Sequence, residues 1–462
     1  MALAYCPGCL DKQRQIDELK DELVQVKTRL RYQERTAAEG PFWSSTPSSK
    51  IPLKPSSLAE RQARHGGGKV GHDGHGRGKL QAEQADRVVD VPAPQRCPDC
   101  GGVLDGKGVR ERAVLDSQPI HVERIVYRLH RGCCSHCGRT VQSSPPGVLP
   151  KVQYGNGLLA HVAVQHYLYG NSLGQLEKQT GVGLSSLIDA MAQLGRWLQG
   201  VPERLIGEYR QAPVKHADET PWRTDGANGY AWLFATADMS IFRFRPSRSA
   251  AVVREVFGEK RLPGVLVVDR YAGYNRAPCR LQYCYSHLLR DLEDLEKDFP
   301  DNAEVAAFVA SLAPLLAAAM GLRGQKLSAR QFRNQAKALR RKIQTLVNQP
   351  ARHPAVQTYQ DIFRDKAHRL YHWAADARVP ADNNLAEREL RPLVIARKVS
   401  FGSQGQRGVR TREVLMTVLH TLRKRTTDPA AAFRSFLDQL AANPKAETFA
   451  LLFAKSPPAS RN

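Results

Sequence analysis

Three carboxylates stand at the edges of three separate predicted elements and have the chemistry needed to bind divalent metal ions. Asp218 lies in a stretch of alternating polar and apolar residues, Asp269 follows the apolar run GVLVV, and Glu387 falls among strong helix formers. Magnesium takes oxygen ligands and keeps several waters, so a few carboxylates suffice to hold it. Two such ions about 3.5–4 Å apart activate an attacking oxygen and stabilise the leaving oxygen of a phosphodiester. The residue types therefore indicate phosphoryl-transfer chemistry.

The elements that must position these acids follow a definite order. The segment from Val214 alternates until it meets Pro221, which predicts a strand with Asp218 near its end. Two aromatic and β-branched strands, a short helix and a strand buried on both faces come next. Their ranges are 230–237, 240–246, 247–258 and 264–269, and Asp238-Met239 separates the first two as a hairpin. This order of strand, strand, strand, helix and strand resembles a ribonuclease H-like mixed sheet.

Glu387 belongs to a predicted helix. Asp382 or Asn383, just after Pro380, is a good N-cap, and LAEREL contains strong helix formers. A helix packed on the sheet can direct one carboxylate toward the two strand acids. A single Asp after a strand is more often a turn residue, and a single Glu on a helix is usually solvated. The ordered set of three favours catalysis much more strongly than any one acid.

Four segments, HADETPWR, VVDRYAGYN, CYSHLLRDL and DNNLAERELRPLVIARKVSFGS, resemble the insertion sequence 66 family of transposases over nearly the whole chain. The resemblance implies a ribonuclease H-like catalytic domain in which Asp218, Asp269 and Glu387 form a DDE triad that uses magnesium or manganese. It implies double-stranded DNA as the partner, both the element ends and the target, and small accessory proteins of the same element. His287 is then expected near the metal site or the scissile phosphate, or else it makes a structural bond at a helix N-terminus.

Two other functions compete with this interpretation. One is a ribonuclease H-like nuclease that cuts nucleic acid without joining it, and the predicted end-binding modules argue against it. The other is a DNA-binding regulator derived from a transposase, and the intact triad argues against that. Transposition requires both cutting, to release 3′-hydroxyls, and joining to target DNA.

The charge of the chain favours a polyanionic partner. Sixty-eight basic and forty-five acidic residues leave a formal net charge of +23 over 462 residues, and neutralising phosphates releases counterions that drive binding. RNA-binding proteins share such a charge, so composition does not choose DNA. The absence of a long apolar run or a signal-peptide pattern predicts a cytoplasmic protein that does not enter a membrane.

Six of the nine cysteines form CxxC pairs, which in a cytoplasmic chain indicates metal binding. Residues 89–147 are predicted to form a zinc ribbon, in which two Gly-containing turns direct four thiolates at a structural Zn²⁺. The alternating segment 121–131 is expected to be a strand between the turns. The four predicted zinc ligands are Cys97, Cys100, Cys134 and Cys137.

The first part of the chain is predicted to mediate self-association. Residues 1–36 contain Cys6 and Cys9 and then a heptad stripe from Ile16 to Leu30, which indicates a short coiled coil and a homodimer or higher oligomer. An amphipathic helix packed on its own protein is the alternative. Two thiols cannot complete a zinc site unless a partner chain supplies the others. Residues 37–88 form a basic linker rich in Pro, Ser and Gly.

The remaining boundaries follow from helical periodicity. A DNA-binding helix-turn-helix is predicted at 148–208, with Ser185 or Ser186 capping its second helix. The catalytic domain spans 209–297 and 376–428, interrupted by an all-helical insertion at 298–375. Residues 429–462 form a final helix and a tail that is loosely ordered from Asn443.

Basic residues after Glu387 are predicted to contact the DNA backbone, because guanidinium groups match phosphate oxygens geometrically. They lie on the predicted helix and in a Gly-rich loop, FGSQGQRGVRTRE, that precedes a closing helix from Thr411 to Arg425. Phosphate contacts position DNA without reading its sequence. The predicted DNA contacts are His287, Arg388, Arg391, Arg397, Lys398, Arg407 and Arg410.

Overall fold

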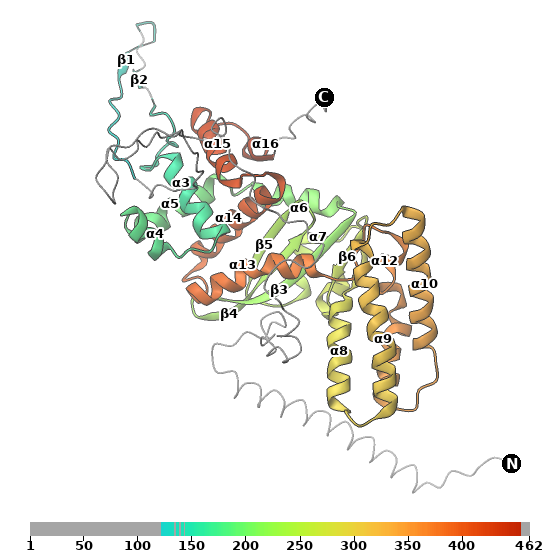
Figure 1. Cartoon of the computed structure of the whole chain (residues 1–462). Coiled ribbons are helices and arrows are strands. Elements are labelled where there is room, and N and C mark those ends of the chain that lie inside the picture. Colours follow the sequence, from blue (N-terminus) through green and yellow to red (C-terminus); the bar gives the residue numbers. More distant parts are fainter. Residues whose placement is uncertain (1–121, 134, 138–139, 143, 454–462) are drawn as a thin grey trace, which may run out of the picture. The chain divides into compact units, whose positions relative to one another are not determined.

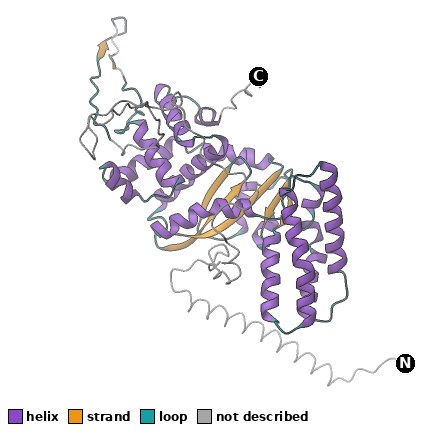
Figure 2. Ribbon diagram, in the orientation of Figure 1, coloured by secondary structure: helices purple, strands orange, loops and turns teal. Residues whose placement is uncertain are grey.

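The computed structural model describes residues 122–133, 135–137, 140–142 and 144–453 (Figures 1 and 2). From Arg124 onward the described residues belong to one compact unit. The N-terminal CxxC pair, the coiled coil, the linker and three predicted zinc ligands, Cys97, Cys100 and Cys134, lie outside the described residues. The fourth, Cys137, is exposed.

A short hairpin is the first described element. Strands β1 (Arg131–Cys133) and β2 (Thr140–Gln142) pair in antiparallel fashion on either side of the second predicted cysteine turn. The expected strand over 121–131 is wrong for residues 122–130, which have no regular structure, and only Arg131 lies in a strand. A strand needs a hydrogen-bonded neighbour, and pairing here begins only at Arg131. The alternation instead marks a segment whose Val126 side chain is 89% exposed.

Helices follow, with breaks at the two predicted glycine sites. Ser172 caps one helix with a capping box to Gln175, and Gly181 ends that helix in the left-handed conformation. The expected cap at Ser185 or Ser186 is wrong: the next helix begins at Leu184, whose N–H donates to the Glu177 carboxylate at 2.9 Å. The helices are α3 (Asn156–Ala163), the π-helix η3 (Val164–Leu168), α4 (Leu173–Thr180), α5 (Leu184–Trp197) and α6 (Val201–Gln211).

A five-stranded mixed sheet follows these helices, in the order β5-β4-β3-β6-β7. β3 pairs antiparallel with β4 and parallel with β6, and the four residues of β6 are all buried, as predicted. The predicted succession of three strands, helix and strand is confirmed. The elements are β3 (Val214–Thr224), β4 (Ala227–Ala235), β5 (Ser240–Arg245), α7 (Ala250–Phe257), β6 (Val265–Val268), the 3₁₀ turn η4 (Ala272–Arg276) and β7 (Arg280–Tyr283).

Strand β3 is longer than expected, which corrects the position of Asp218 from the end of the strand to its middle. The strand continues through Pro221 to Thr224 and turns at Asp225-Gly226, where both residues have positive φ. β6 pairs only with residues 214–216 of β3. Pro221 therefore lies where β3 has no strand on its second side, so its missing N–H costs no ladder bond.

The edge strand β5 is covered by α14 (Gln406–Arg425). Side chains spaced four residues apart on this helix accept backbone N–H groups of β5: Thr417 from Phe242 at 3.0 Å and Thr421 from Ser240 at 3.1 Å. This arrangement occupies donors that an open sheet edge would expose. The predicted loop before Thr411 is corrected, because α14 already begins at Gln406.

The insertion is all-helical among the described residues, as predicted. One of its helices, together with the turn after it (Ala303–Gly324), is long and apolar enough to cross a membrane, a test that the core helix of a soluble protein also passes. Its buried residues, such as Leu312 and Leu316, belong to the main apolar core. Helix α8 (Tyr285–Asp298) leads into the insertion, whose helices are α9 (Ala303–Gly321), η5 (Leu322–Gly324), α10 (Ala329–Val347), α11 (Pro354–Asp365), η6 (Ala367–Arg369) and α12 (His372–Ala375).

The C-terminal part is more ordered than predicted. α15 (Pro429–Ala442) is followed by α16 (Thr448–Phe453), so the expected loose tail from Asn443 is wrong as far as residue 453. Leu452 is 9% exposed, and the Arg204 guanidinium lies 5.3 Å from the Phe449 ring. Packing against α15, α14 and α6, with the cation–π contact of Arg204, thus holds the final helix.

Candidate active site

The strand register brings the two predicted catalytic aspartates together. Val214 pairs with Val265 and His216 with Val267 in the parallel β3–β6 ladder. Continuing this register by two residues sets Asp218 beside Asp269, where β6 ends. The Asp269 carboxylate accepts the Tyr271 N–H at 2.9 Å, and its side chain remains 20% exposed.

Helix α13 (Asn384–Ser400) brings the third acid to the sheet. It packs against β3 and β4, and Figure 1 shows it lying across the sheet. Glu387 lies in its first turn. Along the same side of β3, the Arg397 guanidinium donates to the Thr220 hydroxyl at 3.0 Å and to the Pro221 carbonyl at 2.6 Å. The helix is therefore fixed to the strand that carries Asp218.

Asn383 anchors the start of α13 and was not predicted to have this role. Asn383 is the N-cap residue of α13, one of the two residues predicted for that position, but its side chain makes no capping hydrogen bond. Instead its amide donates to the Ala217 carbonyl at 2.9 Å, and its oxygen lies 2.9 Å from His216 Nδ1. Burial lowers the pKa of His216 to about 4, so the neutral ring donates to Asn383. Asp382 accepts the Asn384 N–H in its place.

The three acids interact electrostatically. Burial and the negative charges of Glu219, Asp269 and Glu387 raise the pKa of Asp218 well above its ordinary value. Burial also raises the pKa of Asp269, against a backbone hydrogen bond and Arg248. Carboxylates that repel one another in a buried site are stabilised by divalent cations, which are hard ions that take oxygen ligands. The donor set therefore fits magnesium or manganese.

A fourth carboxylate lies on the other face of β3. Side chains alternate along a strand, so Glu219 points away from Asp218. The Arg248 Nε donates to Glu219 at 2.6 Å, the Tyr274 hydroxyl also donates to it, and its side chain is 1% exposed. Arg248 reaches to 4.0 Å from Asp269. This pairing was missed from sequence, because only the fold brings residues 219, 248 and 274 together.

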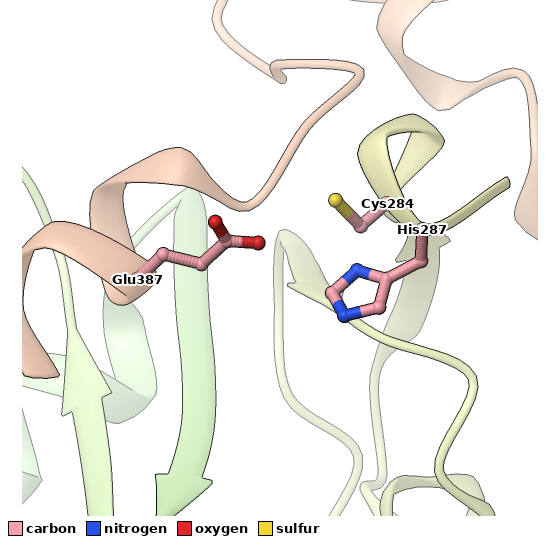
Figure 3. Close-up of side chains that lie close together, drawn as sticks. All are labelled: Cys284, His287 and Glu387. Atoms are coloured by element: carbon pink, nitrogen blue, oxygen red, sulfur yellow. The ribbon is translucent and has the colours of Figure 1, made fainter. Parts of the chain in front are cut away.

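The predicted site histidine lies beside the third acid. Ligand atoms of Cys284, His287 and Glu387 all lie within 4.8 Å of one another (Figure 3). Burial and the charges of Arg290 and Arg270 lower the pKa of His287 to about 4, so the ring is neutral. Arg290 donates to Glu387 at 3.2 Å. We define these three residues, Cys284, His287 and Glu387, as the thiol–imidazole–carboxylate cluster.

The predicted DNA contacts differ in their surroundings. Arg397 is half-buried and donates to β3, whereas Arg407 forms an exposed ion pair with Asp189 at 2.8 Å. The other predicted basic residues are exposed and lie on α13 or in the first turns of α14. These are Arg388, Arg391, Lys398 and Arg410.

The raised pKa of Asp218 predicts a cost in stability for the metal-free protein. A carboxyl whose pKa is higher in the folded state binds more protons there, so stability falls as pH rises from about 4 through the folded-state pKa. Asp218→Asn is therefore expected to raise Tm at pH 8 without magnesium, by about 2–4 °C per kcal/mol for a domain of 150–250 residues.

Calorimetry at pH 5 and pH 8 checks this expectation. The gain should be smaller at pH 5, and added magnesium should stabilise the wild type but not the variant, because ligands stabilise the state they bind. A variant that is less stable than wild type at pH 8 would contradict the electrostatic account.

Comparison with known proteins gives a consistent picture. A family model described as "Transposase IS66 family" matches residues 151–411. Uncharacterized protein y4qI of Sinorhizobium fredii (strain NBRC 101917 / NGR234) is 28% identical over 419 residues, which cover 80% of this chain and 76% of that protein. Uncharacterized protein y4jD of the same organism is 24% identical over 403 residues, 76% of each chain. The matched region contains all three acids.

Proposed function

The chain belongs to the IS66 transposase family, and on that premise we propose that it is a metal-dependent DDE transposase that cuts DNA and joins the ends to a target. The observation that carries the proposal is the convergence of Asp218, Asp269 and Glu387. Asp218 lies on β3, Asp269 directly follows the parallel neighbour β6, and Glu387 lies on α13. The negative charges of Asp269 and Glu387 both raise the pKa of Asp218. We assign the five-stranded sheet to a ribonuclease H-like fold.

The three acids would hold magnesium or manganese. When bound, two such ions lower the pKa of an attacking hydroxyl and stabilise the leaving oxygen. The protein's own contribution is to hold the acids and to place positive groups beside them. Arg248 lies near Asp269 and Arg290 near Glu387, and guanidinium groups suit the non-bridging phosphate oxygens.

The proposed reaction has two phosphoryl transfers in one site. Water attacks the phosphodiester at the element end and breaks the bond to the 3′-oxygen, which leaves as a 3′-hydroxyl. That hydroxyl then attacks a target phosphodiester, forms a new bond to phosphorus and displaces a target 3′-oxygen. Atoms and charge balance without an external energy source. No protein nucleophile takes part.

The other assignments complete the proposal. His287, Arg388, Arg391, Arg397, Lys398, Arg407 and Arg410 are proposed DNA contacts, with Arg397 acting mainly by fixing α13 to β3. The zinc ribbon with Zn²⁺ at Cys97, Cys100, Cys134 and Cys137 and the helix-turn-helix at 148–208 would bind the terminal inverted repeats. A homodimer or higher oligomer, helped by small accessory proteins, would act on DNA in the cytoplasm.

A strand-transfer assay tests the proposal. Purified protein is incubated with labelled element-end DNA and a target plasmid in magnesium, and joined products are separated by size. Joined products support transposition. Cleavage without joining, even after accessory proteins are added, would favour the nuclease. Binding without cleavage would favour the regulator.

A further inference from the structure

The thiol–imidazole–carboxylate cluster has a donor set unlike that of the three acids. It offers a sulfur, an imidazole nitrogen and a carboxylate oxygen. Hard cations such as magnesium select oxygen ligands, whereas thiolate and imidazole together suit zinc and related softer ions. The cluster therefore has a different metal preference from the triad with which it shares Glu387.

The starts of helices α8 and α13 bring these three donors together. Cys284 is the N-cap residue of α8 and His287 lies three positions later, a spacing that puts both on one side of a helix. Glu387 approaches from α13, and Figure 3 shows the three side chains directed toward one another. The Asn383 N–H donates to the Cys284 sulfur at 3.1 Å, which ties the starts of α8 and α13 together. The Tyr285 N–H also donates to the Ala381 carbonyl at 2.8 Å, so a backbone hydrogen bond joins the same two segments.

One polar atom of the cluster has no partner to account for its burial. His287 Nδ1 is buried and has no hydrogen-bond partner among the described residues. A buried polar nitrogen without a partner is unfavourable, so such atoms call for a ligand or another cause. In Figure 3 the imidazole lies beside Glu387 and below Cys284.

We propose that Cys284, His287 and Glu387 form a second metal site, selective for Zn²⁺, whose occupation withdraws Glu387 from the magnesium-dependent reaction. Zinc bonds of about 2.0–2.3 Å set tetrahedral ligands roughly 3.3–3.6 Å apart. The present separations, up to 4.8 Å, would have to close by about 1.2–1.5 Å through side-chain rotation. Water completes the coordination, the thiol releases its proton, and Arg290 yields its contact with Glu387.

The inhibitory consequence rests on the proposed function, whereas the metal site does not. Zinc bound at the cluster holds the carboxylate that the triad needs, so zinc should inhibit strand transfer in competition with magnesium. The proposed ribbon would use four other ligands, Cys97, Cys100, Cys134 and Cys137, so zinc bound there does not occupy the Glu387 carboxylate.

Metal binding is measured first, on the full chain, with Co²⁺ as a spectroscopic probe for Zn²⁺. Wild type should bind one more equivalent than Cys284→Ser and show a stronger thiolate-to-cobalt absorption band. Cys279→Ser is the matched control, since Cys279 is partly buried nearby on the chain but outside the cluster, and it should match wild type. His287→Gln should also lose one equivalent.

Equal stoichiometry in wild type, Cys284→Ser and His287→Gln would overturn the site. If Cys284→Ser fails to fold, as judged by circular dichroism, His287→Gln decides alone. In the second arm, zinc is titrated into strand transfer, with each protein normalised to its own zinc-free rate. The half-inhibitory zinc concentration should rise at least tenfold in Cys284→Ser, and an unchanged value would refute the inhibitory role. Absence of joining by wild type would refute the proposed function and leave the metal measurement valid.

Discussion

Asp269→Asn is expected to reduce strand transfer by at least about 10³-fold, the scale on which losing one member of a catalytic unit reduces a rate. The amide carries no negative charge to balance a divalent cation. Asp269 directly follows β6, and its side chain is 20% exposed. Asp218→Asn and Glu387→Gln should act similarly, because the charges of Asp269 and Glu387 both raise the pKa of Asp218, as expected for one shared site. Gel-resolved joining rates in magnesium measure the effect.

Two features make this experiment specific. DNA binding, followed by fluorescence anisotropy at fixed salt, should stay within a few-fold of wild type, since every proposed basic DNA contact is retained in these variants. Glu293→Gln is the matched control, because Glu293 is an exposed acid of α8, and it should retain full joining. The proposed triad would be wrong if any one of its three variants joined DNA at the wild-type rate.

Asn383→Leu is expected to cost about 2–5 kcal/mol in stability and to raise the magnesium concentration needed for joining. The substitution leaves the His216 ring nitrogen and the Ala217 carbonyl buried without partners, at roughly 1–3 kcal/mol each. It also frees the start of α13, and with it Glu387, from the strand that carries Asp218. Denaturant unfolding gives the first effect and a magnesium titration of joining gives the second.

The neighbouring Asn384→Ala serves as the control, since Asn384 is exposed and only its backbone N–H is used, by Asp382. It should be nearly neutral in both assays. The measurements are made at a temperature where every variant is folded. If Asn383→Leu lost stability but kept the wild-type magnesium requirement, Asn383 would be purely structural and would not position the site.

Local sequence patterns were sufficient to predict the order of the strands and helices around the candidate site. They also placed Asp269 directly after a buried strand and Glu387 in the first turns of a helix. The run Val265–Val268 is apolar throughout because both of its faces are covered, and that property is visible in composition alone. The helical insertion and the helix of Glu387 were predictable for the same reason, since periodicity and capping residues act over a few positions. Family resemblance supplied the grouping of the acids.

Errors arose where a partner distant in sequence decided the conformation. Pro221 was expected to end β3, yet the strand continues because no neighbour requires the missing N–H. One correction is local: the Asp225-Gly226 turn that ends β3 is itself a hairpin signal of the sequence. The segment 122–130 alternates like a strand but has no pairing partner among the described residues.

Only the tertiary structure could decide which side chains meet. Asn383 looks like an ordinary helix cap in the sequence, and packing against β3 directs its side chain to His216 and Ala217 instead. The Thr417 and Thr421 hydroxyls cover the edge of β5 from a helix about 180 residues later. Chemistry-bearing residue types and short elements are encoded locally, whereas their distances depend on long-range packing of the whole chain, which no local pattern contains.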